Sequence, residues 1–194
     1  FFSAHTYYWG DRHWSIFMGP KRAARMSPTG SALRKGVRFT VHLDTPVTPM
    51  VPVLSVWSTV NRLSTGGRTI GEAERITPMQ ALRAVTIEAA FSWRKEDDLG
   101  SITPGKLANF TVVDDDPLAV DPMRLGDIEV IGTFFEGRWF PVADASRANR
   151  RQAVDARRRS PIAPAADVHR DHHGCACAVV RHLTSAIDAA GRAA

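Results

Sequence analysis

Residues 37–46, Val-Arg-Phe-Thr-Val-His-Leu-Asp-Thr-Pro, are the stretch that decides the fold. Apolar side chains at the odd positions up to Leu43 alternate with polar ones at the even positions up to Asp44. A period of two places these sets on opposite faces of a β-strand, which Pro46 ends. A strand with one polar face suits a barrel whose chemistry lies at its mouth.

Strand and helix signals alternate on both sides of this stretch. The aromatic run Phe1–Tyr8 predicts a strand, and Ser27-Pro28 predicts the start of a short helix that ends near Gly36. Downstream, apolar spacing predicts a helix over Val53–Leu63, and Thr77–Gln80 is a capping box that opens another helix. This order favours parallel strands covered by helices, which is an α/β fold.

The character of the sequence changes after residue 98. Pro104-Gly105 is typical of a type II turn before a strand that reaches Val113. Glu136-Gly137 separates two β-like runs, which predicts a tight hairpin. We therefore expect barrel elements over residues 1–98 and a small β module over residues 99–142.

Charge and composition argue against two classes of binding partner, nucleic acids and membranes. Residues 1–142 hold 16 Lys and Arg against 15 Asp and Glu, so the net charge of +5 belongs mostly to residues 143–194. The main body has no excess charge for a polyanion, and we expect no nucleic-acid partner. No stretch approaches the roughly 20 apolar residues of a membrane span, so no membrane partner is expected either.

Residues 143–194 are rich in Ala and Arg and poor in large apolar side chains, which predicts a disordered tail. Its histidines and cysteines match no closed zinc motif. The two cysteines, Cys175 and Cys177, are too close for an ordinary disulfide. Two cysteines are also too few for a disulfide framework, which favours a reducing, cytoplasmic location.

Two residues stand where barrel chemistry is expected. His5 lies near the end of the first aromatic run, and a neutral imidazole there is a good zinc ligand. Asp44 ends the decisive strand, where a carboxylate can bind a metal and take a proton from water. The alternatives are a histidine held by hydrogen bonds among aromatics, and an aspartate that caps the following loop through the Thr45 or Val47 amide. His42 and Asp11 are further candidates for substrate contacts, although an interior filler and a solvated loop are the simpler interpretations.

Three motifs, in this order, resemble the amidohydrolase superfamily, specifically the amidohydrolase 3 group that includes N-substituted formamide deformylase-like proteins. Residues 1–13, Phe-Phe-Ser-Ala-His through Trp-Gly-Asp-Arg-His, resemble its sixth barrel strand and loop. Residues 39–47 resemble its eighth strand, and residues 100–109 resemble its return to a β-sandwich. The resemblance covers about residues 1–142. Leu43 and Asn109 depart from the group's pattern, but neither departure removes a ligand.

The resemblance implies a fold and a chemistry. It implies the C-terminal part of a (β/α)8 TIM-type barrel followed by a β-sandwich module. It implies a metal-dependent hydrolase of carbon–nitrogen bonds other than peptide bonds, acting on a small-molecule amide or formamide-like substrate. By this resemblance His5 binds the metal, and Asp44 both binds it and handles the proton of the attacking water.

The same resemblance implies what lies outside this chain. The cofactor is a divalent metal, zinc before others, as one or two ions whose remaining ligands come from the missing N-terminal half. The intact enzyme can be a homo-oligomer. The alternative interpretation is a non-catalytic truncated remnant or an interaction module without activity of its own.

The tail gives the first prediction. Limited proteolysis should cut first between Ala143 and Pro164, because this segment lacks the apolar surface needed to fold. Mass spectrometry of the earliest fragments measures this. Early cleavage within the body, with residues 143–164 intact, would contradict it.

Overall fold

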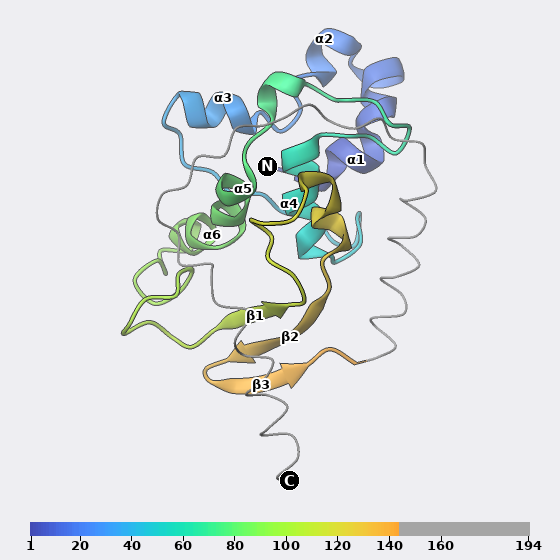
Figure 1. The fold of residues 1–194 in the computed structure, drawn as a ribbon. Coiled ribbons are helices and arrows are strands. Elements are labelled where there is room, and N and C mark those ends of the chain that lie inside the picture. The colour runs from blue at the N-terminus through green and yellow to red at the C-terminus, as the bar shows by residue number, and fades with distance from the viewer. Residues whose placement is uncertain (144–194) are drawn as a thin grey trace.

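The computed structural model describes residues 1–143, which form a helical body followed by a three-stranded sheet (Figure 1). The body contains α1 (Ser3–Arg12), the π-helical turn η1 (His13–Phe17), α2 (Pro20–Ala23), α3 (Thr29–Arg34), α4 (Pro52–Asn61), the 3₁₀ turn η2 (Glu72–Glu74), α5 (Pro78–Val85) and α6 (Ile87–Ser92). The sheet contains β1 (Phe110–Val113), β2 (Val130–Phe135) and β3 (Arg138–Pro141), with the 3₁₀ helix η3 (Pro122–Asp127) between β1 and β2. No helix in this described part is long and apolar enough to cross a membrane.

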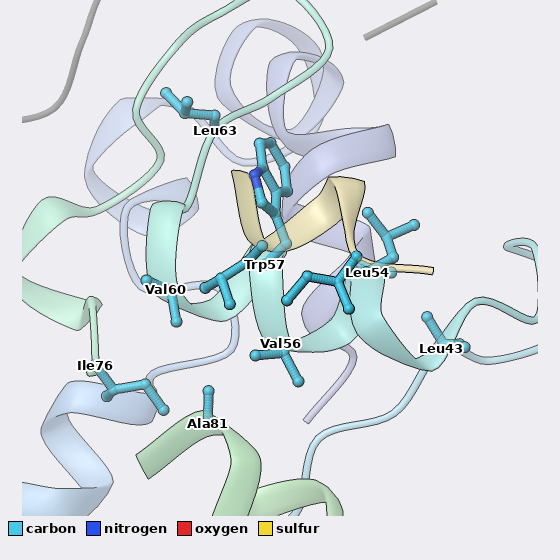
Figure 2. Packing of buried hydrophobic residues seen from close by; sticks show 11 residues of the cluster. Leu43, Leu54, Val56, Trp57, Val60, Leu63, Ile76 and Ala81 are labelled. Atoms are coloured by element: carbon cyan, nitrogen blue, oxygen red, sulfur yellow. The ribbon is translucent and has the colours of Figure 1, made fainter. Parts of the chain in front are cut away.

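Helix α4 is the centre of the core. It is buried from Leu54 to its end, so neighbouring elements enclose it on all sides rather than along one stripe. Figure 2 shows the side chains of Leu54, Val56, Trp57 and Val60 leaving α4 in different directions. Helices α1 and α5 and the turn η3 pack against it. The Trp57 indole nitrogen donates to the Met123 carbonyl at 2.9 Å, which ties α4 to η3.

The predicted helices are present with small shifts. Helix α5 begins with the expected capping box, in which Thr77 and Gln80 exchange side-chain to backbone hydrogen bonds of 2.9 and 3.3 Å. Helix α3 begins at Thr29, one residue later than predicted. The reason is that the Ser27 hydroxyl donates to the Phe2 carbonyl and does not cap the helix.

The strands predicted in the first 98 residues are wrong as regular strands. Residues 3–12 form helix α1, and residues 37–44 form no ladder beyond one parallel bridge between Phe2 and His42. The alternation along 37–44 is nevertheless partly real, since Val41 and Leu43 are buried whereas His42 is exposed. A barrel strand needs hydrogen-bonding neighbours on both edges, and a helix satisfies its own backbone when such neighbours are not there.

The β module agrees with the sequence. Strands β1, β2 and β3 pair antiparallel in chain order, and the β2–β3 turn has positive φ at both Glu136 and Gly137. Two left-handed residues match the twist of a tight hairpin. Position 132 in β2 requires glycine, because a Cβ added there would lie 2.3 Å from the Trp139 ring. The sheet lies at the end of the molecule opposite α2 (Figure 1).

Arg62, just after α4, is a buried cation that joins three segments. Its side chain is 1% exposed, and it donates to the carbonyls of Ile70 (2.6 Å), Met26 (2.6 Å) and Ser27 (2.9 Å). Burial lowers the pKa of Arg62 to about 10, so the guanidinium stays protonated at neutral pH. These bonds hold the turn before α3 against the end of α4.

Glu74 anchors the other side of α3. Its carboxylate accepts from the Ser31 amide (2.6 Å) and the Ser31 hydroxyl (2.5 Å). Burial raises the pKa of Glu74, but these two bonds and the cations Arg34 and Arg62 outweigh it, so the pKa lies below its ordinary value. The charged form of Glu74 is therefore the one that the fold stabilises.

The expectations for the tail, namely disorder, the lack of a closed zinc motif and early proteolysis, concern residues that lie almost wholly outside the described range of 1–143.

Replacing Arg62 should destabilise the fold strongly. In Arg62→Met, one buried and two partly buried carbonyls lose their donor, and leaving such groups unsatisfied should lower the free energy of unfolding by about 2–5 kcal/mol. The matched control is Arg25→Met, at an exposed arginine, which should change it by under about 0.5 kcal/mol. Urea unfolding of both variants measures this; equal midpoints would show that the Arg62 network does not hold the turn.

Candidate active site

The site begins with a backbone contact between the start of the chain and residues 40–42. The Phe1 nitrogen donates to the Thr40 carbonyl at 2.7 Å, and the Phe1 carbonyl accepts from the His42 amide at 3.0 Å. Beside these bonds the structure has an isolated parallel bridge between Phe2 and His42. Helix α1 starts at Ser3, so this contact fixes where its first turn lies relative to residues 42–44.

His5 and Asp44 face each other as a result. The His5 Nε2 lies 3.3 Å from the Asp44 Oδ2, and the two side chains are 22% and 37% exposed. The Nε2 atom itself is buried and makes no hydrogen bond, although the carboxylate lies 3.3 Å away. A buried imidazole nitrogen without a hydrogen bond is costly unless something else occupies its lone pair or its proton.

The Asp44 carboxylate is left available by its own loop. The Val47 amide donates to the Asp44 backbone carbonyl at 2.8 Å, and the Thr48 hydroxyl donates to the Leu43 carbonyl. Within residues 1–143 no loop amide donates a hydrogen bond to the Asp44 carboxylate, although the loop-cap alternative requires such a bond. Asp44 has a φ of 64°, a left-handed conformation that aspartate and asparagine adopt more readily than most residues.

An open hollow of about 510 Å³ lies beside the carboxylate. Its polar lining comes from His42, Asp44, Thr45 and Ser55, and its apolar lining from Val41, Leu43, Pro52, Val85 and Ala89. The hollow is closer to an open surface than to an enclosed cavity, so it is less enclosed than a typical small-molecule site. It leaves open space next to the Asp44 side chain.

The other predicted residues take different positions. His42 lines the hollow, and its Nδ1 accepts from the Asp44 amide at 3.2 Å. Burial lowers the pKa of His42, and the Phe1 amino group and His5 lower it further against the opposing effect of Asp44. Asp11 turns away to the 64–68 loop, where its carboxylate accepts from the Gly66 amide (2.9 Å) and meets Arg68 (3.4 Å). Its role as a substrate contact stays a prediction.

The residues present fit part of a metal site. Imidazole nitrogen and carboxylate oxygen are both zinc donors, and the 3.3 Å between the unpartnered His5 Nε2 and the Asp44 Oδ2 is short enough for one ion to contact both atoms. Across residues 1–143, however, no three His, Cys, Asp or Glu side chains come together in a group that could hold a metal ion. A closed site thus needs donors beyond this pair.

Some contacts at the site were not predicted from the sequence. Ser55, Val85 and Ala89 line the hollow although they belong to helices that the sequence assigned only to packing. His13 has a buried Nδ1 without a partner, and burial and the nearby His5 lower its pKa. Helical spacing gave no signal for Ser55. His13 appeared in the sequence analysis only within the family-like stretch 1–13, and nothing there placed it beside His5.

Comparison with known proteins adds a family to this geometry. Residues 2–140 match the model of the Amidohydrolase family. The chain is 32% identical over 113 residues to an N-substituted formamide deformylase from Arthrobacter pascens. The aligned residues make up 58% of this chain and 21% of that protein. Over 109 residues it is 32% identical to the putative amidohydrolase YtcJ from Bacillus subtilis, which is 55% of this chain and 21% of that protein.

A solved amidohydrolase structure from Thermotoga maritima is also similar, with a TM-score of 0.43 and 21% sequence identity over 57% of this chain and 24% of that one. The chain spans about a fifth of the length of the curated relatives it matches.

The geometry of Asp44 predicts how the fold responds to its replacement. Asp44→Asn should change the free energy of unfolding by less than about 1 kcal/mol, because asparagine has the same shape and tolerates a positive φ. Asp44→Val should cost about 1–2 kcal/mol, since a β-branched side chain is strained in that conformation. Thermal and urea unfolding measure both. An Asn variant as unstable as the Val variant would show that the carboxylate is structural.

Proposed function

The chain belongs to the amidohydrolase family, and from this membership we propose that it supplies His5 and Asp44 to the active site of a metal-dependent hydrolase. The reaction is cleavage of a carbon–nitrogen bond other than a peptide bond. The substrate is a small molecule with an amide or formamide-like group. The name of the deformylase relative, N-substituted formamide deformylase, supports this substrate class.

The observation that carries the proposal is the unsatisfied nitrogen of His5. Its Nε2 is buried, makes no hydrogen bond and lies 3.3 Å from the Asp44 carboxylate. A histidine kept for packing alone would normally have a partner for that atom. Two zinc-type donor atoms 3.3 Å apart, beside an open hollow of about 510 Å³, can instead both contact one metal ion.

The coverage of the relatives supports a larger fold than the one described. The chain matches only 21% of either relative, and its site has two donors where a catalytic zinc needs at least three protein ligands. We place residues 1–98 in the C-terminal part of a (β/α)8 barrel and residues 99–142 in a β-sandwich module. The remaining ligands would then lie in the part of the barrel that corresponds to the uncovered length of the relatives.

Three residues of the chain have a defined role in this proposal. The bound divalent cation, zinc before others, would lower the pKa of a water toward neutrality. Asp44 takes the proton of the attacking water at a carboxylate oxygen and later delivers it to the leaving nitrogen. His5 holds the ion through Nε2. The His42 Nδ1 accepts a hydrogen bond from the Asp44 amide at 3.2 Å, and this bond orients the loop that carries the carboxylate.

A second candidate is a non-catalytic remnant or interaction module. It is favoured by the number of donors, since only two of the described side chains converge where catalysis needs more. The two candidates differ in the reading frame upstream of Phe1. By the family resemblance the remaining ligands include a His-x-His pair from the first barrel strand, so the enzyme candidate requires that frame to encode one.

Activity measurements test the proposal at two levels. The 194-residue chain alone should not hydrolyse N-substituted formamides at a measurable rate, because two donors do not fix a catalytic zinc. In the full-length protein, Asp44→Asn should lower kcat by roughly 10²–10⁴ through loss of the general base. His42→Ala should lower it much less.

Two outcomes would contradict this account. Zinc-dependent turnover by the isolated chain, lost in Asp44→Asn, would show that the described residues suffice. Near-normal kcat in a full-length Asp44→Asn enzyme with metal bound would show that Asp44 is not the base.

A further inference from the structure

The ring of Phe2 lies against both histidines of the site. Its centroid is 5.0 Å from that of His5 with the two planes only 18° apart, and 4.4 Å from that of His42 with the planes at 54°. Phe2 is nevertheless 46% exposed, so it is not a core residue. We propose that Phe2 is a positioning residue, whose ring sets the orientation of the His5 imidazole toward Asp44. This rests on the proposed role of His5 as a metal ligand.

The backbone of Phe2 is fixed from two sides. Its carbonyl accepts from the Ser27 hydroxyl at 3.0 Å and from the His5 amide at 3.2 Å, which uses both lone pairs of the oxygen. Ser27 in turn is held by the buried Arg62 through its own carbonyl at 2.9 Å. The Phe2 ring therefore starts from an anchored Cα, although much of the ring is open to solvent.

His5 needs such an orienting contact. A metal-binding histidine is normally oriented by a hydrogen bond from its second ring nitrogen. In residues 1–143 no hydrogen bond of the His5 side chain is found, and Asp44, 3.3 Å from its Nε2, does not accept one. The nearly parallel Phe2 ring takes over this task, because it restricts rotation of the imidazole about both side-chain torsions.

The test uses the full 194-residue chain and two substitutions of one residue. Phe2→Leu keeps an apolar side chain but removes the flat ring, whereas Phe2→Tyr keeps the ring. The matched control is Phe17→Leu, at a 60% exposed phenylalanine whose ring lies 5.6 Å from that of His13. Because Phe2 and Phe17 are both exposed, neither change should unfold the protein.

The first readout is the conformation of His5 without any metal. Three-bond couplings about its Cα–Cβ bond, and ring-to-ring NOEs from residue 2, should report one rotamer in the wild-type chain. Phe2→Leu should average these couplings between rotamers, while Phe2→Tyr and Phe17→Leu keep the wild-type values. Wild-type couplings in Phe2→Leu would overturn the proposal.

The second readout is zinc affinity, measured by competition with a chromophoric chelator and referred to His5→Ala. Phe2→Leu should weaken zinc binding by roughly three- to tenfold, the range expected for one aromatic contact, and Phe2→Tyr should restore it. Equal affinity in Phe2→Leu and wild type would count against Phe2. If His5→Ala leaves zinc affinity unchanged, the metal role of His5 fails, and the His5 couplings alone then decide whether Phe2 orients the ring.

Discussion

The site depends on one backbone contact, the pairing of Phe1 and Phe2 with residues 40–42. Two hydrogen bonds, of 2.7 and 3.0 Å, bring together segments almost 40 residues apart in the chain. Closing a loop of that length costs conformational entropy that two such bonds do not offset alone. The contact therefore relies on the rest of the body, and His5 and Asp44 meet only as long as it is maintained.

The core supplies that support directly beside each site residue. Ala4, which precedes His5, and Leu43, which precedes Asp44, are buried in the same apolar cluster around α4. In Figure 2 Leu43 lies close to Leu54 of α4. His5 and Asp44 thus each follow a buried apolar residue. Packing of the cluster around α4 therefore restrains the backbone next to both residues. The Arg62 network adds a second restraint through Ser27, which binds the Phe2 carbonyl.

Sequence patterns predicted the local features well and the long-range ones poorly. The Thr77 capping box and the Glu136-Gly137 hairpin were correct because each is decided within a few residues. Phe1–Tyr8 was predicted as a strand and is helical from Ser3, since its state depends on hydrogen-bonding partners that a local pattern does not contain. The alternation at 37–44 was correct for Val41 and Leu43, which are buried, but not for Val37, which is 53% exposed, and no regular strand forms. That His5 and Asp44 belong together came from family resemblance; their 3.3 Å approach, and the Phe2 ring between the histidines, required coordinates.

The central claim is that His5 and Asp44 are ligands of one metal ion, and the position of a bound ion tests it most directly. Cobalt(II) can replace zinc in such sites as a paramagnetic probe, and the shifts that it induces in assigned amide resonances locate the ion relative to the fold. The account predicts one ion within about 2.0–2.2 Å of both the His5 Nε2 and an Asp44 carboxylate oxygen, lost in His5→Ala. An ion located elsewhere, for example at His169, His172 and His173, with the His5 and Asp44 resonances unchanged, would contradict the account.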